Sequence, residues 1–442
     1  MNMDKKAVTD ALAWLKGFDR FHIRPGLERM KAMLEALGRP ERGLRFLHIA
    51  GTNGKGSTGA FMTGILREHG FSVGVFSSPA IMHELDRIQY NGSRIGDAEF
   101  VACAERLKRA VSARQDRPTE FEVITALALV YFERVRPDWV IWEAGLGGRW
   151  DATNVVEPHV AVVTNVGHVH LDVLGNTLST IAAEKAGIVK AGHPVVTGAE
   201  GVAESVVKKR AGQLDCPYYQ LDSCVRTVAH VKREEGSSFT YTGLERTLHD
   251  LTITLPGEHK IRNAALAFLV LEVLPRRGCG TLDDTAIRRG LRRTKWPGRM
   301  ELISKHPRIL LDAAHNPEAA ARLKEALPAY FTYRRLCVIA GIFADKDVMS
   351  VLKPFGELAD CFILTSGDHP RYMPADALAN VLANECSCTV KAVPTAEEAV
   401  QEAVKKCGTD DLILVAGSHD LMSTVRRYIV SDLKAKVGDD GR

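Results

Sequence analysis

Apolar residues along the chain follow two alternating patterns. Short unbroken apolar runs, of which Leu44–Ala50 and Trp139–Glu143 are typical, predict strands that are buried on both faces. Longer stretches, such as Pro25–Leu37 and Glu120–Arg134, repeat their apolar residues with the helical period. Because strand-like and helical stretches alternate almost throughout, the pattern predicts an α/β protein with largely parallel sheets.

A second block of the same alternation begins near Arg308. Its expected strands are Ile309–Leu311, Leu336–Gly341, Cys361–Leu364 and Leu412–Ala416. The turn Trp296-Pro297-Gly298 separates the blocks, so we predict a first domain at 1–295, a hinge at 296–299 and a second domain at 300–442. Residues Cys216–Pro256 instead show β-branched alternation and short turns, which predicts an antiparallel addition to the first domain.

Composition narrows the class of protein. The chain has 442 residues, enough for two or three domains, and its 58 basic and 54 acidic residues nearly balance. No apolar stretch approaches the length of a membrane span, and Met1–Val8 lacks the apolar core of a signal peptide. The nine scattered cysteines show no zinc spacing. We therefore expect a cytoplasmic protein with reduced thiols and no nucleic-acid or membrane partner. For its oligomeric state, on which these observations do not bear, the expectation is a monomer.

The sharpest local signal is a glycine-rich turn between a predicted strand and a predicted helix. It reads Gly51-Thr52-Asn53-Gly54-Lys55-Gly56-Ser57-Thr58. Its glycines let backbone N–H groups close around phosphate oxygens, and the helix N-terminus adds positive potential. Lys55 can reach the terminal phosphates, and Ser57 or Thr58 can offer a hydroxyl to Mg²⁺ or phosphate. Although the turn is one residue shorter than the standard P-loop, we predict that it binds the phosphates of ATP.

Two further polar side chains follow predicted strands. Glu143 ends one buried strand, and His170 lies in the segment Asn165–His170 directly after another. A carboxylate at the carboxyl end of a parallel strand, beside a phosphate loop, can hold Mg²⁺ between ATP and the protein. A histidine in such a place is often structural, but its position next to the phosphate loop favours a functional role for His170.

Together these motifs resemble the Mur ligase superfamily, whose shortened loop reads Gly-Thr-x-Gly-Lys, and within it the folylpolyglutamate synthase/dihydrofolate synthase family. The resemblance runs from about residue 20 to about residue 430. It is also carried by Pro25–Met30, Glu143–Arg149, Asp151–Asn154, Glu184–Ile188 and Asp312–Pro317. It implies a P-loop-containing parallel-sheet ATPase domain, a smaller Rossmann-like α/β domain, and an ATP-dependent ligase that adds L-glutamate to a folate.

The resemblance implies roles for single residues. Ser78, Glu143 and His170 would contact two magnesium ions, and Lys185 would carry a carbamate near the metal. On spacing alone, Lys185 could equally belong to a solvated helix face. The residues implied on the ATP or substrate side are Asp151, Asn263, Asp312, His315 and Ser418.

Arg299 directly follows the Trp296-Pro297-Gly298 turn, and an arginine there can swing onto the γ-phosphate as domains close. A salt bridge within the linker is the alternative. With Mg²⁺ and Lys55, Arg299 would stabilise charge while a substrate carboxylate takes the γ-phosphate. The acyl phosphate would then be attacked by the amine of glutamate. The expected substrates are therefore ATP, L-glutamate and a folate or other carboxylate, with dihydropteroate as a further candidate.

Three departures from the family pattern bear on the substrate. Ala80 stands where the family has His, Val169 where it has Asp, and His419-Asp420 where it has Leu-Tyr. The first lies in the loop expected near the pterin, whereas the phosphate and metal positions are intact. Two alternatives stay open: a ligase of the same fold that acts on a non-folate carboxylate, and a nucleotide-binding regulatory protein without catalysis.

Overall fold

The computed structural model describes most of the chain as two compact units. The described residues are 5–19, 24–80, 82–112, 116–168, 171–275, 280–367, 369–383, 385–386 and 388–433. The first unit consists of Met1–Val228, Thr240–Leu251 and Arg262–Thr294. The second consists of Ala229–Phe239, Thr252–Ile261 and Lys295–Arg442.

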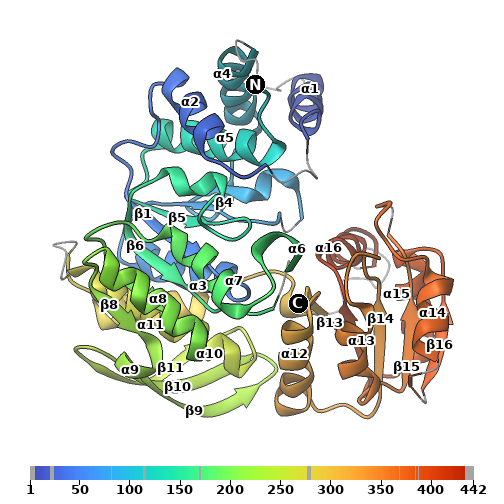
Figure 1. Cartoon of the computed structure of the whole chain (residues 1–442). Helices are drawn as coiled ribbons and strands as arrows, with labels where there is room; N and C mark the ends of the chain where they lie inside the picture. Colours follow the sequence, from blue (N-terminus) through green and yellow to red (C-terminus); the bar gives the residue numbers. More distant parts are fainter. Residues whose placement is uncertain are drawn as a thin grey trace. The chain divides into compact units, whose positions relative to one another are not determined.

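The first unit is built on an eight-stranded sheet (Figure 1). Its strands, in spatial order, are β4 (Ser93–Arg94), β3 (Ile88–Tyr90), β2 (Val73–Phe76), β5 (Trp139–Glu143), β1 (Phe46–Ala50), β6 (Pro158–Val163), β7 (Val195–Thr197) and β8 (Tyr218–Gln220). The six strands β2, β5, β1, β6, β7 and β8, in this spatial order, run parallel to one another. At the β2 side of the sheet, β3 and β4 add an antiparallel edge. The carboxyl ends of β1, β5 and β6 therefore meet at one edge of the sheet, where ligands bind in open α/β sheets.

The helices of the first unit pack on this sheet or on one another through their apolar faces. The helices are α1 (Lys5–Lys16), α2 (Glu28–Ala36), α3 (Lys55–Glu68), α4 (Asp97–Ser112), α5 (Glu120–Val135), α6 (Leu171–Leu174), α7 (Leu178–Lys185), α8 (Gly201–Gln213), α9 (Leu221–Cys224), α10 (Glu258–Val273) and α11 (Asp284–Arg293). Short 3₁₀ turns lie at Glu84–Arg87, Ala152–Val155 and Ala186–Ile188. Thr119 begins α5 with a capping box to Glu122.

Two boundaries differ from the sequence-based expectation. The helix predicted from Pro25 begins at Glu28, because Gly26 has a φ of +122°, outside the helical region. The antiparallel addition predicted from Cys216 begins only at Arg226, since β8 joins the main sheet. The added sheet has the order β11 (Thr247–Ile253), β10 (Gly236–Thr242), β9 (Arg226–Arg233). The short link between β9 and β10 allows only an antiparallel pairing there.

The second unit contains a six-stranded sheet. In spatial order its strands are β12 (Arg299–Lys305), β13 (Arg308–Asp312), β17 (Leu412–Ala416), β14 (Leu336–Ala340), β15 (Cys361–Leu364) and β16 (Thr389–Ala392). Only β12 is antiparallel to its neighbour. The helices are α12 (Pro317–Tyr330), α13 (Val348–Gly356), α14 (Ala375–Ala383), α15 (Ala396–Lys406) and α16 (His419–Tyr428), followed by a π-helical turn at Ile429–Leu433.

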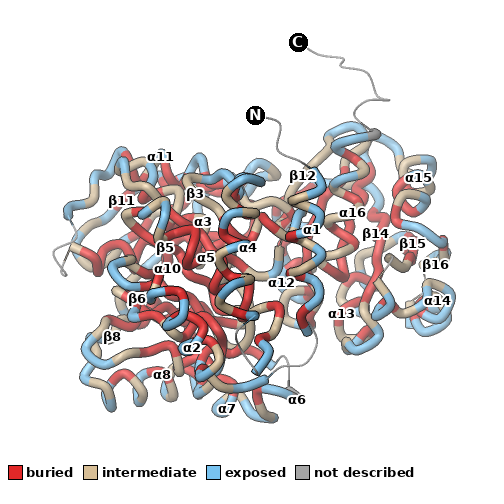
Figure 2. Tube along the Cα trace, turned by 90° about the horizontal axis from the view of Figure 1, so that it is seen from above, coloured by how far each residue is buried: buried red, intermediate tan, exposed pale blue. Residues whose placement is uncertain are grey.

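Alternate strand residues supply the two cores of this sheet. Leu310, Val338 and Leu414 join an apolar cluster on one face, whereas Ile309 and Ile413 join a cluster on the other. In Figure 2, β14 and β5 both lie in buried stretches of their units. The predicted fold class is therefore confirmed: a parallel-rich P-loop sheet and a second α/β sheet.

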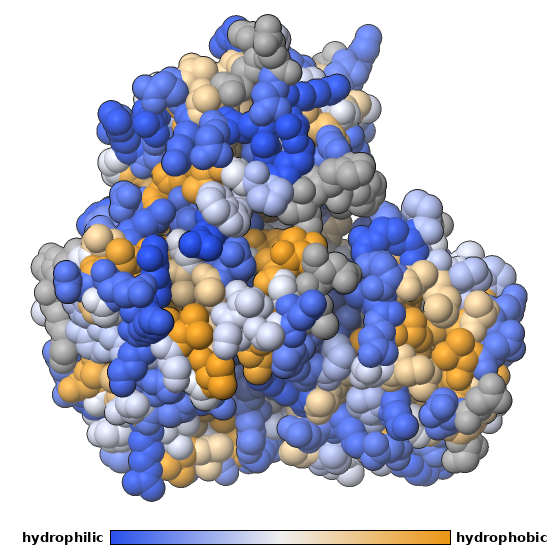
Figure 3. All heavy atoms as spheres, viewed as in Figure 1, coloured by the Kyte–Doolittle hydropathy of each residue, from blue (hydrophilic) through white to orange (hydrophobic). Residues whose placement is uncertain are grey.

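The surface agrees with the balanced composition. Hydrophilic residues cover much of the face shown in Figure 3, and apolar atoms gather in smaller patches. Trp150 and Val202 are among the large apolar residues that are exposed. Among the residues that the structure describes, none of the helices combines the length and apolar character needed to cross a bilayer.

Candidate active site

The glycine-rich turn links β1 to α3, as predicted, and has no room for side chains at two of its glycines. Gly51 has a φ of +156°, and a Cβ there would lie 1.9 Å from the hydroxyl oxygen of Thr164. Gly54 precedes α3 with a φ of +83°, and a Cβ there would lie 2.7 Å from Oδ1 of Asn263. The turn therefore needs glycine for both its shape and its close approach to its neighbours.

The polar residues that follow β6 hold the turn in shape. The backbone N–H groups of Thr52 and Asn53 donate to Asn165, at 3.1 Å to its carbonyl oxygen and 2.8 Å to its side chain. The Thr164 hydroxyl donates to the Asn53 carbonyl at 2.7 Å, and the Gly167 N–H donates to the Thr52 hydroxyl at 2.9 Å. A phosphate site shaped in advance by such bonds loses little entropy on binding.

We expect Gly51→Ala to disturb this turn. The added methyl group would force Thr164 or the backbone to move, which costs about 1–3 kcal/mol of folding free energy for an overpacked site. Urea unfolding and ATP titration measure both consequences. Gly212→Ala is the matched control, because Gly212 lies in α8 and, among the described residues beyond its own stretch of helix, no atom lies within 4 Å of the added Cβ. Equal stability and ATP affinity in the two variants would contradict the close packing at Gly51.

Lys55 is the first residue of α3 and lies over the turn. Its Nζ donates to the carbonyl oxygen of Gly51 at 3.0 Å and lies 4.0 Å from the Glu143 carboxylate. Glu143 ends β5, and its side chain is only 7% exposed. The structure thus brings the predicted phosphate lysine and the predicted metal carboxylate together.

Oxygen-bearing side chains gather at the ends of the neighbouring strands and fit the preference of Mg²⁺ for oxygen ligands. Ser57 and Thr58 are buried, and among the described residues the Thr58 hydroxyl has no hydrogen-bond partner. Ser78 follows β2 and accepts a bond from Arg87 at 3.1 Å. Within the described part of the chain, the buried hydroxyl of Ser77 also has no hydrogen-bond partner. Ser77 directly follows β2 and was not singled out from the sequence.

The metal site predicted from the sequence is only partly described. His170 and Val169 lie outside the described residues. Within the described ranges, no three His, Cys, Asp or Glu side chains are grouped as a metal cluster. Mg²⁺ commonly keeps several waters and uses one or two carboxylates plus substrate phosphates, so Glu143 with hydroxyl groups is a suitable donor set.

Lys185 is buried at the last position of α7, with 2% exposure. This burial excludes a solvated helix face. The segment around Lys185 is locked to the loop that follows β5: the Arg149 N–H donates to the Glu184 carbonyl at 2.7 Å, and a Cβ on Gly148 would lie 2.9 Å from the Lys185 carbonyl. The side-chain amide of Asn154 also donates to the Arg149 carbonyl in the loop and to the Gly187 carbonyl just after Lys185.

Asp151 is buried beside the same loop and is engaged by the protein itself. Its Oδ2 accepts from the Leu146 N–H at 2.8 Å, and its Oδ1 accepts from the N–H and hydroxyl of Thr153. Burial raises the pKa of Asp151 above its usual range, while these bonds oppose the rise. The structure therefore gives Asp151 a bracing role, and its predicted contact with substrate stays a prediction.

In the second unit, Asp312 is the last residue of β13, and its carboxylate forms hydrogen bonds with backbone next to the predicted hinge. Its two carboxylate oxygens accept from the N–H groups of Met300 and Ala314 at 2.9 and 2.8 Å. The Ala313 N–H also donates to the carbonyl of Gly298 at 3.0 Å. Asp312 thus fixes the backbone beside Arg299, and its contact with ATP stays a prediction.

Arg299, His315 and Ser418 lie around one end of the second sheet. Nη2 of Arg299 lies 3.0 Å from Nε2 of His419, and the rings of His315 and His419 are 5.1 Å apart. Ser418 is buried and caps α16 by accepting from the Leu421 N–H. The ligand roles predicted for these residues are untested. Sequence reasoning missed His419 as a candidate, although its departure from the family pattern is visible in the sequence.

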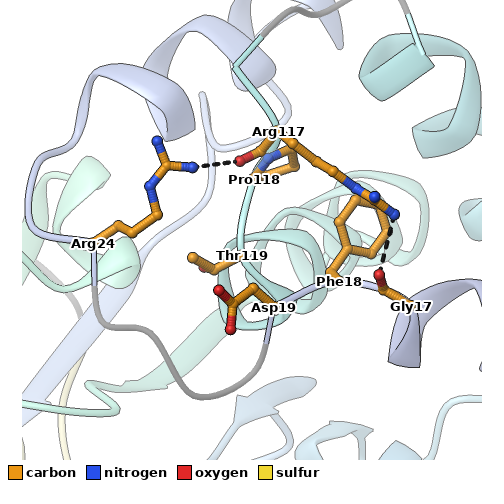
Figure 4. Close-up of a pocket in the computed structure, with 7 residues that line it drawn as sticks. All are labelled: Gly17, Phe18, Asp19, Arg24, Arg117, Pro118 and Thr119. Atoms are coloured by element: carbon orange, nitrogen blue, oxygen red, sulfur yellow. Dashed lines mark hydrogen bonds between the residues drawn. The ribbon is translucent and has the colours of Figure 1, made fainter.

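A separate pocket of about 430 Å³ lies in the first unit (Figure 4). It is lined by Gly17, Phe18, Asp19, Arg24, Arg117, Pro118 and Thr119. Arg24 donates to the Arg117 carbonyl and to Asp116, while Arg117 donates to the Gly17 carbonyl. Both guanidinium groups are thus engaged by the protein, and no predicted site residue lines this pocket.

Comparison with known proteins covers nearly the whole chain. Residues 49–271 match the Mur ligase middle domain, and residues 298–419 match the Mur ligase glutamate ligase domain. A dihydrofolate synthase/folylpolyglutamate synthase from Bacillus subtilis is 38% identical over 436 residues, which cover 96% of this chain and 99% of the relative. A relative with the same description from Escherichia coli is 30% identical, covering 96% of both chains.

Solved structures agree with these sequence matches. A folylpolyglutamate synthase from Mycobacterium tuberculosis, complexed with ADP, superimposes with a TM-score of 0.89 and 29% identity, covering 97% of this chain and 99% of that chain. E. coli FolC, in complex with DHPP and ADP, superimposes with a TM-score of 0.88 and 28% identity, covering 97% and 98% of the two chains.

Proposed function

The chain belongs to the folylpolyglutamate synthase/dihydrofolate synthase group of the Mur ligase family and is an ATP-dependent ligase that joins glutamate to a folate. From this premise we propose the role that each of its site residues has in binding the substrates and in the two steps of the reaction. The observation that carries the proposal is the shaped phosphate loop, with Lys55 placed between the Gly51 carbonyl and the Glu143 carboxylate.

Lys55 and the N-terminus of α3 bind the β- and γ-phosphates of ATP. Lys55 exchanges its contact with the Gly51 carbonyl for phosphate oxygens, and the backbone N–H groups of residues 54–57 cradle the rest. Asn263 and the Thr164–Asn165 pair keep the loop in its binding shape. Ser57, Ser78, Glu143 and His170 would hold the magnesium ions, which neutralise phosphate charge when bound.

Arg299 stabilises the phosphoryl group during its transfer. The γ-phosphorus is attacked by a carboxylate oxygen of the folate substrate, the bond to the β-phosphate oxygen breaks, and ADP leaves. The neutral amine of glutamate then attacks the acyl carbon of the acyl phosphate, the bond from that carbon to the phosphate oxygen breaks, and the nitrogen loses a proton as the amide forms and phosphate leaves. His315 and Ser418 are proposed to lie on the amino-acid side of this second step.

A carbamate on Lys185 would place negative oxygens near Glu143 and the metal ions. It forms when the neutral Nζ attacks CO₂ and loses a proton. The burial of Lys185, and the lock between its segment and the loop after β5, support a fixed position for such a group. We also propose that the enzyme acts as a monomer in the cytoplasm. The free thiols of its described cysteines are compatible with that compartment.

The loop that follows β2 bears on which acceptor the enzyme takes. Ala80 follows the Ser78–Pro79 pair in the loop where the family pattern has a histidine, so pterin contacts there differ. We propose that tetrahydrofolate is the main acceptor and that dihydropteroate is a second one. A non-folate carboxylate is the alternative acceptor that the departures leave open.

Substrate-dependent phosphate release tests this proposal. Purified enzyme, ATP, Mg²⁺ and L-glutamate are combined with tetrahydrofolate, with dihydropteroate, or with a panel of simple carboxylic acids. We expect phosphate release with tetrahydrofolate that requires glutamate, together with a glutamylated product in the mass spectrum. Release only with a non-folate acid would support the alternative, and release with dihydropteroate would establish the second activity.

A further inference from the structure

Arg299 has an unusual hydrogen-bond partner for an arginine proposed to act on phosphate. A guanidinium can only donate, so Nε2 of His419 accepts the 3.0 Å bond, which requires that Nε2 carries no proton. Among the described residues, no carboxylate forms an ion pair with Arg299. By contrast, Arg426 in the same unit pairs with Glu301 at 2.9 Å, which largely neutralises its charge.

We propose that His419 is a positioning residue that orients Arg299 without neutralising it. A planar guanidinium must be held in one direction to form paired bonds with a phosphoryl group. A carboxylate partner would hold it equally well but would compete with the phosphate for its charge. A neutral imidazole acceptor fixes the direction and leaves the positive charge available. The inference rests on the role proposed above for Arg299.

The surroundings of His419 are rigid enough for this task. His419 is the first residue of α16, directly after the cap Ser418. The hydroxyl of Tyr372 lies 2.7 Å from the Ser418 hydroxyl and donates to Asp420 at 3.1 Å, so both neighbours of His419 in sequence are held. The ring of His315, which is itself bonded to the Ala313 carbonyl, lies against the His419 ring.

The same contacts explain one departure from the family pattern. His419 and Asp420 stand at the two positions where the sequence leaves the expected Leu-Tyr. His419 contacts Arg299, and Asp420 contacts Tyr372. The departure therefore adds a polar support for Arg299 rather than removing a part of the site.

Three substitutions at position 419 separate positioning from stability. His419→Gln keeps a neutral acceptor and should retain most of kcat. His419→Leu removes the acceptor and should lower kcat about ten- to hundredfold, with a smaller change in KM for ATP. His419→Glu should fold well, because an acid in the first turn of a helix is favourable, but should lose as much kcat by neutralising Arg299.

Arg299→Ala, measured beside them, distinguishes the role of Arg299 from that of His419. If Arg299→Ala keeps wild-type kcat, the role of Arg299 is wrong and the His419 inference falls with it. If Arg299→Ala is impaired while His419→Leu or His419→Glu turns over like wild type, only the His419 inference is overturned. A His419→Gln variant as slow as His419→Leu would overturn that inference too. We expect Arg299→Ala/His419→Leu to be no slower than Arg299→Ala, because both changes remove one function.

Discussion

Lys55→Ala is expected to lower kcat by about a hundred- to a thousandfold while the protein still folds. Removing one fixed charge from a site that stabilises a developing anion typically costs about a hundred- to a thousandfold in kcat, and Lys55 is the charge placed over the phosphate turn. The fold should tolerate the change. The turn is also held by Asn165 and by Thr164, and lost lysine contacts with carbonyl oxygens cost about 1 kcal/mol.

The measurement is steady-state phosphate release with tetrahydrofolate and glutamate, together with urea unfolding of the same preparation. Lys324→Ala is a matched control, because Lys324 pairs with Glu357 on the exposed surface of the second unit. Lys55→Arg adds information, since its planar guanidinium cannot replace a point charge at a crowded turn. Turnover close to wild type in Lys55→Ala would contradict the assignment of this turn as the phosphate site.

The parts of the site that the sequence predicted well are local. The turn from Gly51 to Thr58 is recognisable because its glycines, lysine and hydroxyls stand at fixed short spacing between an apolar strand and a helix. Strands β5 and β17 were predicted with their observed bounds, because uninterrupted apolar runs end abruptly at polar residues. Glu143 followed from the same rule, since it is the last residue of β5.

The parts that were missed depend on contacts between distant segments. Nothing in the local sequence of the phosphate turn shows that Asn165 shapes it, because the two segments meet only when β1 and β6 pair. Likewise, the sequence alone does not distinguish an aspartate that binds substrate from one that stabilises a loop. Only the bonds from Leu146 and Thr153 reveal what Asp151 does in the fold.

His419 illustrates a third kind of limit. Its departure from the family pattern was visible in the sequence, but its meaning was not, because Arg299 is 120 positions away. Arg299 begins β12, which pairs with β13, and His419 follows β17, which also pairs with β13. These two pairings bring Arg299 and His419 to the same end of the second sheet. A residue that differs from the family pattern, and so suggests that a ligand contact is lost, can therefore provide a new contact that holds another site residue in place.

Substitution of Lys185 is expected to cause the second large loss of activity. Its pattern distinguishes a carbamylated lysine from a buried lysine that is unmodified. If Lys185 carries a carbamate, activity should fall when dissolved CO₂ is removed and recover when bicarbonate is added. Lys185→Ala should lose about a hundredfold or more in kcat, since it removes negative oxygens expected beside the magnesium ions. Acetate or formate added to Lys185→Ala should restore part of the activity by occupying the vacated space.

Lys185→Arg is the decisive variant, because arginine keeps a positive charge and cannot form the carbamate. A buried cation at the last position of α7 would repel Mg²⁺, whereas a carbamate would attract it, so this variant should be as inactive as Lys185→Ala. Lys190→Arg, a half-buried lysine near the same loop that bonds the Asn154 carbonyl, controls for packing. Full activity in Lys185→Arg, or wild-type activity that is indifferent to CO₂, would show that Lys185 works as an unmodified amine.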